Sequence, residues 1–175
     1  MPKPPFRQRF DAVDTALCLR MNRGVHSHGL RTLLRGVSRL GDGVAWYALM
    51  LALPVVYGMS AWPVVARMVL AGLVGLVSYK WLKSKTSRPR PYQVYADIVA
   101  GCPSLDRFSF PSGHTLHAVC FTLIACHAYP ELWPLLGPFS VLIAVSRPVL
   151  GVHYPSDVLA GAGLGALIAA IAIGT

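Results

Sequence analysis

Charged residues are scarce in this sequence, and acidic ones above all. Only 13% of its 175 residues are charged, and 7 Asp and Glu stand against 16 Lys and Arg. Hydrophobic residues make up 54% of the chain, and the mean hydropathy is +0.52, which a water-soluble globular domain does not reach. The abundance of Val, Leu and Ala, without a Gly-X-Y period or a long heptad run, excludes disorder, collagen and coiled coil. The composition therefore predicts an integral membrane protein.

Several kinds of site are missing as well. The four cysteines form no CxxC pair, so neither a zinc site nor a disulfide framework is indicated. No cluster of Asp and Glu is present to hold Mg²⁺, and we predict no metal and no other cofactor. An excess of positive charge would suggest nucleic-acid binding in a soluble protein. The long apolar runs favour a membrane instead, so no nucleic-acid partner is predicted.

Five apolar stretches are long enough to cross a bilayer, whose core of roughly 30 Å needs about 20 helical residues. They cover about 43–60, 62–82, 113–129, 132–146 (short unless it continues toward 150) and 155–173. The connections at Ala61 and at residues 130–131 are so short that the helices beside them must be antiparallel neighbours. Gly161 and Gly165 form a GxxxG pair that favours close helix packing.

Residues 10–40 combine apolar residues at helical spacing with five arginines. This pattern predicts two short amphipathic helices, broken near residues 24–28, that lie at the bilayer surface with their arginines toward lipid headgroups. The predicted fold is thus an all-α membrane bundle of about five transmembrane helices. We divide it into an amphipathic interfacial region, 1–42, and a transmembrane catalytic bundle, 43–175.

Polar residues that are costly near hydrocarbon gather in three clusters, each at the end of a predicted span. They are Lys83-x6-Arg90-Pro91, Pro111-Ser112-Gly113-His114 and Ser146-Arg147-x5-His153-x3-Asp157. When the spans are traced in order, all three clusters emerge on the same membrane face. Two further cations beside the first cluster, Lys85 and Arg88, are predicted to face headgroups.

The cations of these clusters predict a site for a multiply charged phosphate. Guanidinium groups such as those of Arg90 and Arg147 match phosphate oxygens with two parallel hydrogen bonds, and Lys83 adds a third charge. Residues 112–114 stand at a helix start, where free backbone N–H groups and the positive dipole end attract anions. Gly113 allows the backbone to approach the ligand closely.

Two histidines can supply the chemistry of phosphate transfer. His153 precedes Asp157 by four positions, so one helical turn can bring the carboxylate to the imidazole Nδ1–H. The other ring nitrogen would then be free to attack phosphorus, as in catalytic triads. His114 is available to protonate the leaving oxygen, while the cations neutralise the developing charge.

The three clusters, written KxxxxxxRP, PSGH and SRxxxxxHxxxD in this order, resemble the motifs of the type 2 phosphatidic acid phosphatase superfamily. That family includes bacterial membrane lipid phosphatases and, more distantly, vanadium haloperoxidases. Every motif position matches. The resemblance implies that His153 forms a phosphohistidine held by Asp157, that His114 is the general acid, and that water releases phosphate without a metal. It implies phosphate binding by Lys83, Arg90, Ser112, Gly113 and Arg147.

The predicted function is therefore a metal-independent phosphatase acting on a lipid phosphomonoester or diphosphate. Phosphatidic acid, phosphatidylglycerol phosphate, undecaprenyl diphosphate and lipid A all fit, because an apolar tail site does not encode chain identity. The alternatives are a phosphotransferase with the same intermediate, a non-catalytic lipid-phosphate binder and a vanadate-dependent oxidant. The predicted partners are the lipid substrate and membrane lipids, with no obligate protein partner.

Two arguments disagree on the membrane face that carries the site. Of the 16 Lys and Arg, all but Arg67 lie on the face of the three clusters, which favours a cytoplasmic site. Many bacterial members of the resembling family work on the outer side of the inner membrane, and surface arginines can bind anionic headgroups in either leaflet. We predict a multi-pass inner (plasma) membrane protein of bacterial type with an extracytoplasmic site and a C-terminus on the opposite face.

Overall fold

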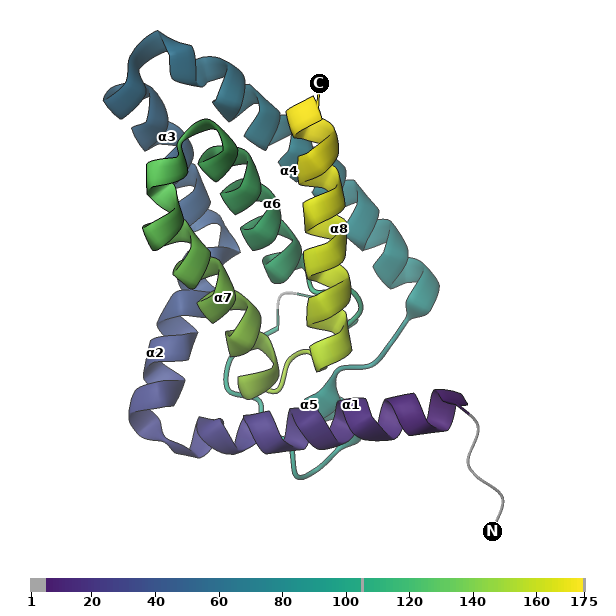
Figure 1. Cartoon of the computed structure of the whole chain (residues 1–175). Coiled ribbons are helices and arrows are strands. Elements are labelled where there is room, and N and C mark those ends of the chain that lie inside the picture. Colours follow the sequence, from purple (N-terminus) through teal and green to yellow (C-terminus); the bar gives the residue numbers. More distant parts are fainter. Residues whose placement is uncertain (1–5, 105, 175) are drawn as a thin grey trace.

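The computed structural model describes residues 6–104 and 106–174, and every regular element in this part of the chain is a helix. Five of these helices form a bundle (Figure 1): α3 (Ala45–Tyr57), α4 (Trp62–Thr86), α6 (Gly113–Ala128), α7 (Trp133–Val149) and α8 (Pro155–Gly174). They coincide with the five predicted apolar stretches, so the predicted all-α bundle is confirmed. Within the described residues, three helical stretches are long and apolar enough to cross a membrane: His28–Val94, which contains α3 and α4, Pro130–Val149 and Pro155–Gly174.

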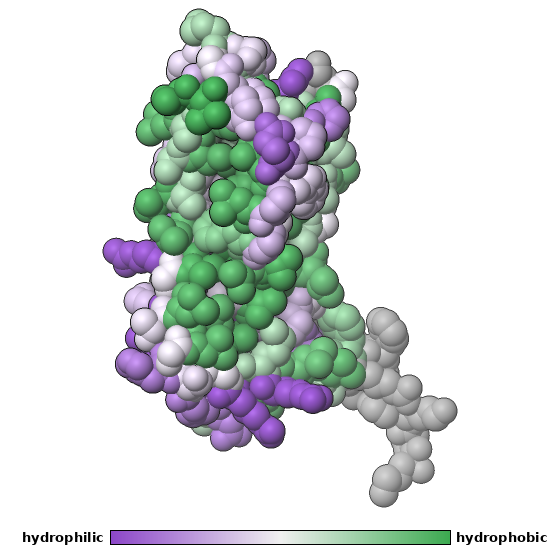
Figure 2. Space-filling view, turned by 60° about the vertical axis from the view of Figure 1, so that its left-hand side comes forward, coloured by the Kyte–Doolittle hydropathy of each residue, from purple (hydrophilic) through white to green (hydrophobic). Residues whose placement is uncertain are grey.

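Large apolar side chains cover the outside of this bundle. Leu51, Val55, Leu135 and Leu159, for example, are 68% to 85% exposed. The face shown in Figure 2 carries hydrophobic side chains over its middle, with hydrophilic ones densest at its lower end. Since a water-soluble protein rarely exposes so much contiguous apolar surface, this surface is one that faces lipid.

The connections between helices follow the predicted pattern. The short turns η3 (Gly58–Ala61) and η4 (Pro130–Leu132) make α3 and α4, and likewise α6 and α7, antiparallel neighbours. The long segment between α4 and α6, which contains α5 (Pro91–Val94), lies at the end of the bundle that α1 crosses. The C-terminus lies at the opposite end (Figure 1).

The N-terminal part of the chain forms α1 (Phe6–Asn22), η1 (Arg23–His26) and α2 (His28–Arg39), with the break where it was predicted. Helix α1 lies across the end of the bundle, whereas α2 turns toward α3 and packs against α7 (Figure 1). The segment η2 (Leu40–Val44) joins α2 to α3. The proposed boundary at residue 42 falls inside η2, and the division into two regions stays a prediction.

Helix α6 occupies the centre of the bundle, between α4, α7 and α8. Its closest neighbour is α8, because a side chain at Gly161 or Gly165 would collide with the backbone carbonyl oxygen of Ser112, just before α6, or of Leu116 on α6. The predicted GxxxG contact is therefore confirmed. It holds the beginning of α8 beside the beginning of α6, where two of the three polar clusters lie.

Candidate active site

The three polar clusters converge on one cavity of about 320 Å³ at the α1 end of the bundle. Its polar lining comes from four helices and two loops, so no single element builds it. Six residues of the predicted site line it: Lys83, Arg90, Gly113, His114, Arg147 and His153. The other two, Ser112 and Asp157, are fully buried directly behind this lining. The backbone N–H of Ser112 donates a 3.0 Å hydrogen bond to the carbonyl oxygen of Asp157, which ties the second and third clusters together.

His153 and Asp157 face each other as the four-residue spacing predicts. His153 Nδ1 lies 3.6 Å from Asp157 Oδ2, slightly beyond hydrogen-bond range, and finds no hydrogen-bond partner among the described residues. Asp157 Oδ2 instead accepts a 2.8 Å hydrogen bond from the backbone N–H of Tyr154. The carboxylate therefore stands opposite the imidazole, but the predicted hydrogen bond is not formed in this structure.

The environment of His153 favours a neutral imidazole. Burial, and then the positive charges of Arg147, Arg90 and Lys83, hold the pKa of His153 well below its ordinary value. A neutral ring keeps a lone pair on one nitrogen, which a nucleophile requires. Nε2 lies 3.4 Å from Arg90 Nη1 at the cavity surface, so it is the ring nitrogen that can reach a bound phosphoryl group.

Two of the three predicted phosphate-binding cations share one carboxylate, that of Asp106. Lys83 Nζ lies 2.7 Å from Asp106 Oδ2, and Arg90 Nη2 lies 2.7 Å from Asp106 Oδ1. Burial alone would raise the pKa of Asp106, but Lys83 and Arg90 bring it below its usual value. Sequence reasoning did not identify Asp106. The signal available in the sequence was an acidic residue in the long loop, six positions before Ser112 of the second polar cluster.

Arg147 has an Nε donor that no described residue uses. Its side chain is 2% exposed, and its Nη1 donates to the hydroxyl oxygen of Ser38 on α2. Its Nε has no hydrogen-bond partner in the described part of the chain. A buried guanidinium with an unpaired donor beside a cavity is suited to bind an anion.

The prediction for Arg88 is wrong, because its side chain faces the protein interior. Arg88 Nη1 donates to Asp157 Oδ1 at 2.7 Å, and its Nη2 donates to Asp14 Oδ2 at 2.8 Å. Asp14, on α1, also accepts a 2.9 Å hydrogen bond from the backbone N–H of Ser156 at the start of α8. Arg88 thus links α1 to the carboxylate behind His153. Lys85 is exposed, as predicted.

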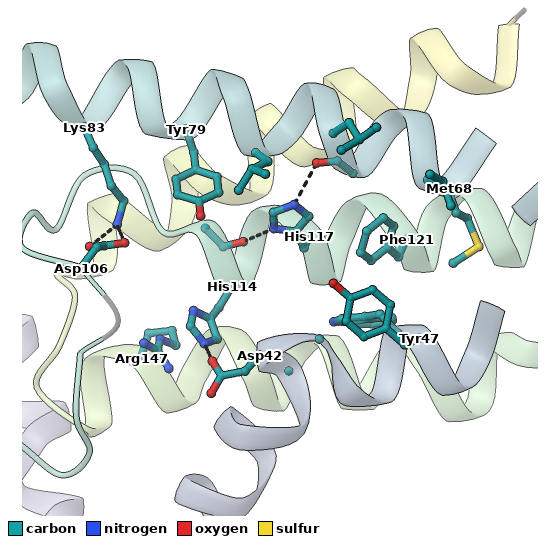
Figure 3. Close-up of a pocket in the computed structure, with 18 of the residues that line it drawn as sticks. Asp42, Tyr47, Met68, Tyr79, Lys83, Asp106, His114, His117, Phe121 and Arg147 are labelled. Atoms are coloured by element: carbon teal, nitrogen blue, oxygen red, sulfur yellow. Dashed lines mark hydrogen bonds and ion pairs between the residues drawn. The ribbon is translucent and has the colours of Figure 1, made fainter. Parts of the chain in front are cut away.

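His114 is the second residue of α6 and contributes the second histidine of the site. Its Nε2 contacts the carboxylate of Asp42 in η2, and its side chain is 11% exposed. Figure 3 shows the ring between Asp42 and the cationic end that holds Arg147, Lys83 and Asp106. Because α6 begins at Gly113, the first backbone N–H groups of this helix lie at the cavity. Sequence reasoning did not identify Asp42 either.

Beyond the cationic end, the cavity is apolar. It continues between α3 and α4 along Tyr47 and Met68, with Phe121 of α6 behind them (Figure 3). The site therefore joins a cluster of cations and histidines to a hydrophobic channel among helices that face lipid. Such a combination suits an amphiphile with a phosphate at one end.

Known proteins are similar to this chain in both sequence and fold. The family model described as the PAP2 superfamily matches residues 43–174. The chain is 30% identical over 156 residues to phosphatidylglycerophosphatase B of Bacillus subtilis, covering 79% of this chain and 71% of that protein. It is 34% identical over 150 residues to the decaprenylphosphoryl-5-phosphoribose phosphatase of Mycobacterium tuberculosis, covering 82% of this chain and 78% of that protein.

Two crystal structures resemble the bundle closely. Aquifex aeolicus LpxE superposes with a TM-score of 0.80 at 26% identity, over 91% of this chain and 94% of LpxE. The transmembrane PAP2-type phosphatidylglycerolphosphate phosphatase from Bacillus subtilis superposes with a TM-score of 0.79 at 26% identity, over 95% of this chain and 85% of that one. Sequence and structure thus point to the same group of proteins.

Proposed function

The chain belongs to the PAP2 superfamily and is a membrane lipid phosphatase, and we propose that it hydrolyses a lipid phosphomonoester or diphosphate through a phosphohistidine on His153. The observation that carries this proposal is the single cavity whose one end holds buried cations and two histidines and whose other end is apolar. The apolar end accommodates the lipid chain, while the phosphate reaches the cations.

Binding begins at the cations. We propose that phosphoryl oxygens take the place of the Asp106 carboxylate on Lys83 and Arg90, and that they also bind the guanidinium of Arg147, whose Nε has no partner among the described residues. Backbone N–H groups at the start of α6 add hydrogen bonds beside Gly113. These groups stabilise the negative charge of the transition state without any rearrangement of the helices.

The reaction then takes two steps. His153 Nε2 attacks phosphorus, the bond from phosphorus to the leaving oxygen breaks, and His114 gives its proton to that oxygen. Water next attacks the phosphohistidine while His114 takes one of its protons, so that inorganic phosphate leaves and both histidines regain their starting state. Asp157 orients the His153 ring, and Arg88 holds Asp157 in place.

The names of the relatives support a substrate class for this chain. They act on phosphatidylglycerophosphate and on decaprenylphosphoryl-5-phosphoribose, which are both lipid phosphates with different chains and headgroups. We propose that this chain accepts a substrate of the same class. The test is phosphate release from a panel of lipid phosphates by the detergent-solubilised protein, with vanadate as inhibitor. A phosphotransferase would instead give a phosphorylated acceptor, and a binder would give neither product.

Turnover is expected to survive EDTA, because side-chain cations and a helix N-terminus supply the positive charge of the site. Within residues 6–104 and 106–174, no three His, Cys, Asp or Glu side chains gather closely enough to hold a metal ion. Phosphate release would be measured before and after dialysis against the chelator. Loss of activity that one specific metal ion restores would contradict a metal-independent mechanism.

We propose that the protein is a multi-pass protein of a bacterial inner membrane, with its site on the extracytoplasmic face. Labelling of single cysteines at the exposed positions Arg23, Asp97 and Gly174, in a variant without the native cysteines, tests this arrangement. Positions 23 and 97 are expected to react with an impermeant reagent added outside intact cells, and position 174 only after permeabilisation. Labelling of position 174 alone would place the site in the cytoplasm.

A further inference from the structure

Asp42 lies outside the three family motifs, yet its side chain reaches into the cavity. It belongs to η2, the break between α2 and α3, where Gly43 adopts a φ of 135°. That positive φ is open to glycine and strained for other residues. The local turn allows the chain to change direction beside the site, and it directs Asp42 toward His114.

The position of Asp42 is fixed by packing on both sides. Gly41 lies so close to Ile143 of α7 that a side chain there would approach within 2.9 Å. Trp46, which follows Asp42 by one helical turn, is 1% exposed and packs its ring against Phe121 and Phe139 at 5.6 and 5.7 Å. One turn before Asp42, Ser38 contacts Arg147. The carboxylate is therefore held against the site by the core itself.

The charges around His114 indicate a role for the Asp42 carboxylate. Arg147 and Lys83 face the ring from α7 and α4, and His153 and Arg90 lie on the same cavity wall. Two nearby carboxylates are already engaged, Asp106 with Lys83 and Arg90, and Asp157 with Arg88. Among the described residues, Asp42 is thus the acid that stands opposite His114, where its negative charge counteracts the burial and the positive charges that disfavour a proton on the ring.

We propose that Asp42 is the positioning residue of His114, holding its Nε2–H so that Nδ1 carries the proton that is transferred. In the first step the bond from phosphorus to the leaving oxygen breaks, and its electron pair stays on that oxygen. The leaving oxygen accepts the proton from His114 as the Nδ1–H bond breaks, and the electron pair of that bond stays on Nδ1. Asp42 keeps the Nε2 proton throughout and fixes the ring plane. This inference rests on the proposed phosphatase function. The arrangement mirrors that of Asp157 and His153, with the two ring nitrogens exchanged.

The test compares two leaving groups in Asp42→Asn. With an alkyl phosphate, whose alkoxide needs a proton, kcat/KM, which reports the phosphorylation step and not the later hydrolysis of the phosphohistidine, is expected to fall on the order of 10²-fold. With p-nitrophenyl phosphate, whose leaving group departs without a proton, kcat/KM should change less than about 5-fold. Asp97→Asn, at an exposed loop position, is the matched control and should behave as wild type with both substrates. An equal loss with both substrates, or no loss with either, would overturn the inference.

A second measurement keeps the inference testable if Asp42→Asn folds poorly. Asp42→Glu retains a carboxylate and should recover part of the alkyl phosphate activity. In a double-mutant cycle, Asp42→Asn should cause no further loss in a His114→Asn background, because both act through one proton transfer. Additive losses would show that Asp42 acts independently of His114. The proposed function itself fails if the wild-type protein releases phosphate from none of the lipid phosphates in the panel, whichever result the variants give.

Discussion

Replacing His153 with alanine is expected to abolish phosphate release, with kcat falling by at least about 10⁴-fold. The residue supplies the lone pair that attacks phosphorus, and no other described histidine takes its place at the cationic end of the cavity, because His114 is turned to Asp42. Binding of vanadate or phosphate should persist, since Lys83, Arg90 and Arg147 are separate groups. Turnover is measured as phosphate release, and anion binding by calorimetry.

The control for this experiment is His127→Ala, at an exposed position near the far end of α6. It should retain wild-type turnover. Asp157→Asn should keep a fraction of the activity, because it leaves the nucleophile in place and loses the ion pair with Arg88. Turnover close to wild type in His153→Ala would remove His153 from the mechanism and exclude a phosphohistidine at this position.

Exchanging Arg147 for lysine is expected to lower kcat/KM on the order of 10²-fold although the charge is kept. The guanidinium is buried, lines the cavity, contacts Ser38 through Nη1 and has an Nε donor without a partner among the described residues. A lysine ammonium cannot make the planar, two-pronged contact with phosphate oxygens while it also reaches Ser38. Kinetics with a lipid phosphate, together with thermal unfolding, would separate lost catalysis from lost stability.

The matched control is Arg67→Lys on the exposed side of α4, which should change neither activity nor stability. If Arg147→Lys retains the full kcat/KM, positive charge alone is sufficient at this position. The argument from guanidinium geometry would then be wrong, although the location of the phosphate site would still stand.

The positions of the helices and of the three polar clusters were determined by the sequence alone. Each of the five apolar stretches became a helix, since a long apolar run must satisfy its own backbone hydrogen bonds when it enters lipid. The three polar clusters were visible because charged groups at the ends of such runs are costly without a function. Their convergence followed from the order and number of the spans, which bring Lys83, His114 and His153 to the same end.

Only the tertiary structure revealed the other acidic partners of the site, Asp14, Asp42 and Asp106. Asp42 contacts His114 across 72 positions, and Asp14 contacts Arg88 across 74. Hydropathy identifies which stretches enter the membrane, but it does not determine how each helix is rotated or which ends of α1 and η2 meet α6 and α8. Those relations depend on side-chain packing, such as that of Gly41 on Ile143. For this reason the cations, the histidines and Asp157 were predictable one by one, whereas the contacts of Asp14, Asp42 and Asp106 were decided by the packed bundle.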